Sequence, residues 1–160
     1  MITTLFLLLL AQTGRQRVVV QPAQISDWKV EITTDGGFSG QGSGNVTVSS
    51  NGTLVITLLN KKECNYQLTA GELQALNAAI ANARPATWSE CYSLADVSTH
   101  CCDLIRTTFS LSANGDRSKY VTSWLTGVPP LPLDLQNIVD LLRGPAGIDT
   151  RYRALCASTP

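Results

Sequence analysis

The fold is decided by residues 28–59, which read WKVEITTDGGFSGQGSGNVTVSSNGTLVITLL. Apolar and polar residues alternate in the segments 28–34, 44–50 and 53–60, and this period of two is typical of strands with one buried face. Asn51-Gly52 lies between the second and third segments and is the pair that a two-residue hairpin turn prefers, because both of its central residues take positive φ. The stretch therefore predicts a β-meander that carries a glycine-rich loop.

A helix and a second hairpin follow this meander. Thr69 and Glu72 form the pattern of a capping box ahead of apolar residues at helical spacing, which predicts a helix over 70–83. The remaining expected elements are strands over 106–113 and 118–124 and a helix over 135–142. The side chains expected to face the sheet include Leu73, Leu76, Ile80 and Leu135. The order βββ-α-ββ-α predicts an α+β domain in which two helices pack on one face of an antiparallel sheet.

The N-terminus has the pattern of an export signal. Residues 5–11 form an apolar run of the length found in signal peptides, too short to span a bilayer. The alternative is a buried N-terminal strand or helix, but the polar residues that follow do not continue a core pattern. The expected organisation is a signal peptide, a flexible arm, one α+β domain and a C-terminal tail, over residues 1–13, 14–26, 27–143 and 144–160 respectively.

Charge argues against two kinds of partner. The chain has 12 Lys and Arg residues against 12 Asp and Glu residues, and its pI is about 6.5. No overall field attracts nucleic acid, and nothing after the leader is expected to insert stably into a membrane. Arg143, Arg151 and Arg153 gather near the C-terminus and are interpreted as a solvated end rather than a binding patch.

The cysteines support export to an oxidising compartment, and they are Cys64, Cys91, Cys101, Cys102 and Cys156. The adjacent Cys101 and Cys102 are not expected to bond to each other, because their side chains point apart in an extended segment. We predict that Cys64 and Cys91 each pair with one of these two, and we prefer Cys64–Cys102 with Cys91–Cys101 over the other permutation. Cys156 on the tail is then the spare thiol, although sequence alone does not fix the connectivity.

Catalytic motifs are missing from the sequence. His100 is its single histidine, and it has neither an HExxH zinc motif nor a Gly-x-Ser-x-Gly elbow. A dyad of His100 with an adjacent cysteine is disfavoured because sequence neighbours seldom oppose their side chains, and a zinc cluster lacks the spacing of paired Cys-x-x-Cys ligands. The glycines of residues 40–44 lead into a strand rather than a helix, which argues against phosphate binding. We therefore expect a protein that is not an enzyme and has no metal or cofactor.

Residues 30–40, VEITTDGGFSG, resemble the strand and the Gly-Gly-Phe/Ile-Ala/Ser-Gly motif of emfourin-type domains, which are small inhibitors of thermolysin-like zinc metalloproteases. The resemblance continues through the leucine-patterned helix, the later strands and the terminal helix, so it covers about residues 28–142. It implies a protein partner, namely a secreted metalloprotease. The partner-binding residues that it implies are Gly36, Gly37, Phe38, Ser39 and Gly40.

These observations together predict a secreted or periplasmic, non-catalytic binding domain that inhibits a thermolysin-like metalloprotease. Two roles are open for Phe38: its ring either enters a hydrophobic pocket of the partner or folds back to cover the sheet. The alternative function is a structural or adaptor domain of the cell envelope without inhibitory activity.

Overall fold

The alternating segments form strands, and further elements accompany them. The structure is a computed structural model that describes residue 25 and residues 27–37, 42–92, 104–127 and 130–158. Its strands are β1 (Lys29–Gly36), β2 (Asn45–Ser49), β3 (Thr53–Thr57), β4 (Glu63–Gln67), β5 (Cys91–Tyr92), β6 (Ile105–Ala113) and β7 (Ser118–Leu125). Its helices are α1 (Ala70–Ala81), the short 3-10 helix η1 (Pro85–Thr87), α2 (Leu133–Arg143) and α3 (Ile148–Ser158).

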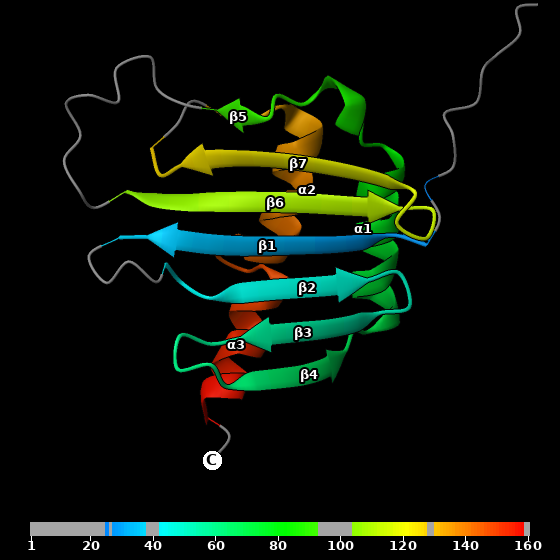
Figure 1. Cartoon of the computed structure of the whole chain (residues 1–160). Coiled ribbons are helices and arrows are strands. Elements are labelled where there is room, and N and C mark those ends of the chain that lie inside the picture. The colour runs from blue at the N-terminus through cyan, green and yellow to red at the C-terminus, as the bar shows by residue number, and fades with distance from the viewer. Residues whose placement is uncertain (1–24, 26, 38–41, 93–103, 128–129, 159–160) are drawn as a thin grey trace, which may run out of the picture.

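The strands form one seven-stranded sheet with the order β4-β3-β2-β1-β6-β7-β5 (Figure 1). Neighbouring strands are antiparallel except β5, which pairs in parallel with β7 at one edge. β1 lies at the centre and places Val30 opposite Val48 of β2 and Leu111 of β6. The apolar residues of these strands therefore align across the sheet and form one continuous apolar face.

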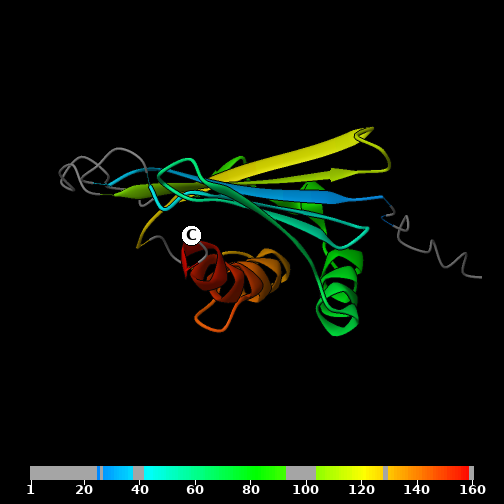
Figure 2. The ribbon, with the colours of Figure 1, turned by 90° about the horizontal axis from the view of Figure 1, so that it is seen from below.

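The three α-helices cover one face of the sheet, as Figure 2 shows. Leu76 and Ile80 of α1 and Leu135 of α2 are fully buried, as the sequence pattern predicted, whereas Leu73 is half-buried. The other large side chains that are fully buried include Phe109, Ile32, Leu54, Ile56, Leu111, Ile138, Leu142, Val30 and Val46. The predicted α+β class, with helices packed on one face of a largely antiparallel sheet, is confirmed.

The prediction of a C-terminal tail over residues 144–160 is wrong, because Ile148–Ser158 form the helix α3. Ile148 and Cys156 are buried, and Tyr152 packs against the core between them. This spacing of four residues places all three side chains on one face of the helix. The folded domain therefore continues past Arg143 to the end of α3.

The β2–β3 turn differs from the two-residue hairpin that Asn51-Gly52 predicted. Residues 50–52 form a three-residue connection in which the Gly52 N–H donates to the Ser49 carbonyl at 2.8 Å. Of the pair, only Gly52 has positive φ, at +84°, while Asn51 Oδ1 accepts the Thr53 N–H at 2.9 Å. Three-residue loops that end in a left-handed residue are the next most common hairpin connections after the two-residue type.

The predicted capping box at α1 is present and also reaches α3. Thr69 Oγ1 accepts the Glu72 N–H at 3.3 Å, and Glu72 Oε2 accepts the Thr69 N–H at 2.8 Å. Glu72 also accepts hydrogen bonds from Arg151 Nη2 at 2.8 Å and from the Tyr152 hydroxyl at 3.2 Å. Burial by itself raises the pKa of Glu72, but these hydrogen bonds and the charge of Arg151 outweigh it and hold the pKa below its usual value of 4.5.

Glu72 should make the fold sensitive to acid. A carboxyl whose pKa is lowered in the folded state stabilises the fold above pH 4.5, and this stabilisation is lost as the pH falls below that value. We expect Glu72→Gln, which retains a capping-box side chain, to lower the free energy of unfolding at pH 7 by about 1 kcal/mol and to flatten the decline in acid. Urea denaturation at pH 7 and at pH values below 4.5 measures both effects. If the variant loses as much stability in acid as the wild type does, Glu72 is not the source of the acid sensitivity.

Candidate binding site

The predicted partner-binding residues lie in the connection between β1 and β2. Gly36 ends β1 and Gly37 follows it, whereas Phe38, Ser39 and Gly40 lie outside the described residues. We call the described ends of this connection the loop base, which consists of Thr34, Gly36, Gly37, Gly42, Ser43 and Gly44.

Gly36 and Gly42 are among the glycines of the loop base that no residue with a Cβ could replace without a clash. Gly36 and Gly42 take φ of +85° and +64°, a region that side chains disfavour. A Cβ on Gly42 would lie 2.5 Å from the Thr34 carbonyl oxygen, and one on Gly36 would lie 2.6 Å from that of Leu104. The backbone therefore approaches its neighbours closely at both ends of the connection.

Thr34 of β1 forms hydrogen bonds with the residues of the loop base that lead into β2. Its Oγ1 accepts the Ser43 N–H at 2.7 Å and donates to the Gly44 carbonyl at 3.0 Å. The Gly42 N–H donates to the Gly36 carbonyl at 2.9 Å. The connection thus leaves and re-enters the sheet at two fixed points.

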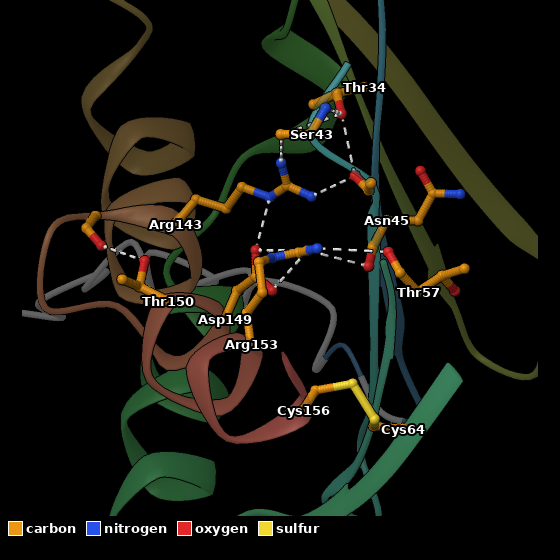
Figure 3. Close-up of polar contacts among 12 residues, drawn as sticks. Thr34, Ser43, Asn45, Thr57, Cys64, Arg143, Asp149, Thr150, Arg153 and Cys156 are labelled. Atoms are coloured by element: carbon orange, nitrogen blue, oxygen red, sulfur yellow. Dashed lines mark hydrogen bonds and ion pairs between the residues drawn. A yellow bond between two sulfur atoms is a disulfide. The ribbon is translucent and has the colours of Figure 1, made fainter. Parts of the chain in front are cut away.

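Arg143, the last residue of α2, reaches the loop base from the helical layer (Figure 3). Its Nη1 donates to Ser43 Oγ at 3.0 Å, and its Nη2 donates to the Gly44 carbonyl at 2.9 Å. A guanidinium holds its donors in a rigid planar fork. These two contacts therefore fix the position of the loop base relative to α2.

Asp149 of α3 places its carboxylate between two guanidinium groups (Figure 3). Arg153 Nη2 donates to both carboxylate oxygens, at 2.8 and 3.1 Å, and Arg143 Nε lies 3.2 Å from Oδ2. The second contact is an ion pair, and among the described residues the buried Nε–H of Arg143 makes no hydrogen bond. Arg153 also donates to the carbonyls of Asn45 and Thr57, at 3.3 and 3.4 Å, and thereby ties α3 to β2 and β3.

The cluster formed by Arg143, Asp149 and Arg153 carries one net positive charge beside the loop base. Burial lowers the pKa of Arg143, the charge of Asp149 raises it, and the charge of Arg153 lowers it. A guanidinium nevertheless keeps its proton in proteins. Two positive groups therefore share a single carboxylate.

The disulfide joins Cys64 of β4 to Cys156 of α3, so the predicted Cys64–Cys102 bridge is wrong. Cys91 on β5 has an exposed free thiol, which also contradicts the predicted Cys91–Cys101 bridge; Cys101 and Cys102 themselves lie outside the described residues. The prediction failed because it placed Cys156 on a solvated tail. As part of α3, Cys156 is instead buried next to an edge strand.

Most of the remaining sequence candidates for chemistry lie outside the described residues. His100 lies outside the described residues, with the cysteines that follow it. Among the residues that are described, no three His, Cys, Asp or Glu side chains are placed to share a metal ion. In the same part of the chain, no helix combines the length and the apolar character needed to cross a bilayer.

Sequence reasoning missed the support that Arg143, Asp149 and Arg153 give to the loop base. One signal was present, because Asp149 and Arg153 stand four residues apart, which is the spacing of a helical ion pair. That spacing has meaning only in a helix, and none was expected there.

Comparisons with protein-family models, with curated proteins and with solved structures found no significant match. The candidate site therefore depends on the geometry of this chain and on the motif resemblance of residues 30–40.

Proposed function

We propose that the mature chain is an exported, non-catalytic binding domain that inhibits a thermolysin-like metalloprotease through the β1–β2 loop. The observation that carries this proposal is the fixed loop base. Thr34 of β1 and Arg143 of α2 both form hydrogen bonds with Ser43 and Gly44 at its β2 end. A loop whose ends are fixed before binding loses less conformational entropy when it docks.

Three further observations support this function. The glycine motif of residues 36–40 resembles that of a family of protease inhibitors. The disulfide between Cys64 and Cys156 is typical of proteins that work in an oxidising compartment. Phe38 is the single aromatic residue between Gly36 and Gly44, and an aromatic ring suits a hydrophobic specificity pocket.

We expect Phe38→Ala to weaken inhibition of a responsive thermolysin-like protease severalfold while leaving the melting temperature unchanged. Inhibition assays and thermal denaturation on the same preparation measure the two effects. A lower melting temperature with unchanged inhibition per folded molecule would instead assign Phe38 to the core.

Leu133→Ala is the matched control, because Leu133 is 76% exposed at the start of α2, the end of that helix opposite to Arg143. It should change neither inhibition nor the melting temperature. If the unmodified chain fails to slow any member of a panel of thermolysin-like enzymes at micromolar concentration, the inhibitor proposal is rejected. An adaptor domain of the cell envelope then becomes the better account.

A further inference from the structure

A pocket of about 420 Å³ lies next to the loop base, and its charged lining residues are Arg143, Arg153 and Asp149. Ser43 of the loop base and Thr150 of α3 add hydroxyl groups to its wall. We call this space the arginine pocket. Ala154 and Ala157 complete the lining and are exposed, so the pocket opens to solvent along α3.

The charges that line the arginine pocket do not balance. Within the described residues, Asp149 is the carboxylate with which both Arg143 and Arg153 form ion pairs. Two guanidinium groups and one carboxylate leave one positive charge. The Arg143 and Arg153 side chains are only 16% and 22% exposed, so water screens this charge less than it would on an open surface.

Arg143 also has hydrogen-bonding capacity to spare. A guanidinium carries five N–H donors. Within the described residues, Arg143 uses two of its Nη–H donors in hydrogen bonds, to Ser43 and Gly44, while its buried Nε faces Asp149. A carboxylate is the acceptor that a guanidinium fork fits best, because two parallel N–H···O bonds can form.

We propose that the arginine pocket binds an aspartate or glutamate side chain of the protein that docks on the β1–β2 loop. This inference rests on the proposed function, because Ser43 belongs to both the pocket and the loop base. A monoanionic carboxylate balances the one uncompensated charge. A dianion such as phosphate would instead leave a negative excess beside Asp149.

Acetate tests the pocket without any partner protein. We expect sodium acetate to cause saturable shifts in the amide NMR signals of Ser43, Thr150 and Ala154, with a dissociation constant in the millimolar range. Sodium chloride at the same ionic strength and the neutral isostere acetamide should not cause them. Shifts that do not saturate, or that acetamide reproduces, would overturn the proposal.

A matched pair of variants tests whether charge is the cause. Ala157 lies four residues after Arg153 on α3, so Ala157→Glu places a carboxylate on the same helix face at the mouth of the pocket. Ala157→Gln fills the same space without charge. We expect the glutamate variant to melt about 1 °C above the glutamine variant, and to bind acetate at least tenfold more weakly than the glutamine variant does. Equal acetate binding by the two variants would overturn the proposal.

The same pair separates this inference from the proposed function. With a responsive protease, Ala157→Glu should weaken inhibition severalfold relative to Ala157→Gln, because the internal carboxylate competes with that of the partner. Equal inhibition by the two variants would show that the pocket takes no part in docking. If no protease responds, the proposed function fails, while the acetate measurement still decides whether the pocket binds a carboxylate.

Discussion

Replacement of Asp149 by asparagine is expected to lower the free energy of unfolding by about 3 kcal/mol. The Asp149 side chain is 5% exposed and lies between Arg143 and Arg153. Asparagine keeps the shape of the side chain but removes its charge, so two largely buried guanidinium groups remain close together without compensation. Urea denaturation at pH 7 measures the loss of stability, and amide hydrogen exchange at Gly42 and Ser43, whose N–H groups are hydrogen-bonded, reports whether the loop base opens more often.

Asp140→Asn is the control for this substitution. Asp140 is exposed on α2 and accepts a hydrogen bond from Gln136 of the same helix. Its replacement should change the free energy of unfolding by less than about 0.5 kcal/mol. If Asp149→Asn costs no more than this control, the buried charges do not hold α3 in place. If stability falls but exchange at Gly42 and Ser43 is unchanged, the cluster of Arg143, Asp149 and Arg153 does not support the loop base.

The elements that could be predicted from the sequence are those with a local signal. The period of two in residues 28–34 needs no information from elsewhere in the chain, and neither does the capping box of Thr69 and Glu72. The helix predicted over 70–83 is accordingly observed at Ala70–Ala81. The α+β class followed from the order of such elements.

β4 and α3, the two elements that contain the cysteines of the disulfide, had weaker local signals in the sequence. In β4, only Cys64 and Tyr66 pair with the inward-facing residues of β3, and a short edge strand needs no longer apolar pattern. In α3, charged residues separate Ile148, Tyr152 and Cys156 and suggested a solvated end. The structure accommodates Arg151 and Arg153 because Glu72 and the carbonyls of Asn45 and Thr57 accept their hydrogen bonds. These acceptors are far from α3 in the sequence, so the local pattern around α3 does not reveal them.

The candidate site was predicted in part for the same reason. The glycines of residues 36–44 mark a loop, because positive φ and close backbone approach require glycine locally. The support for that loop comes from Arg143, which is 100 residues away from Ser43 in the sequence. Only the fold brings α2 and the end of the loop into contact. A sequence motif can therefore predict the loop, but it cannot predict the distant residues that form hydrogen bonds with it.

Loss of the Cys64–Cys156 disulfide should lower the stability of the fold more than any of the other substitutions proposed above. Its two cysteines are 92 residues apart, so reduction frees a long loop in the unfolded chain. We expect the double variant Cys64→Ala/Cys156→Ala to lose about 4 kcal/mol of unfolding free energy and to melt about 10 °C lower than the oxidised wild type. Thermal denaturation with and without a reductant measures this, and the reductant should shift the wild type but not the double variant.

Cys91→Ser provides the comparison, because Cys91 has an exposed free thiol on the edge strand β5. It should change the free energy of unfolding by less than about 0.5 kcal/mol. Non-reducing peptide mapping should recover the peptide of Cys64 joined to that of Cys156. Recovery of Cys64 joined to Cys101 or Cys102 would refute this pairing, and α3 would then be held to the sheet without a covalent bond, by the contacts of Arg153 and by the packing of Tyr152 on Tyr66.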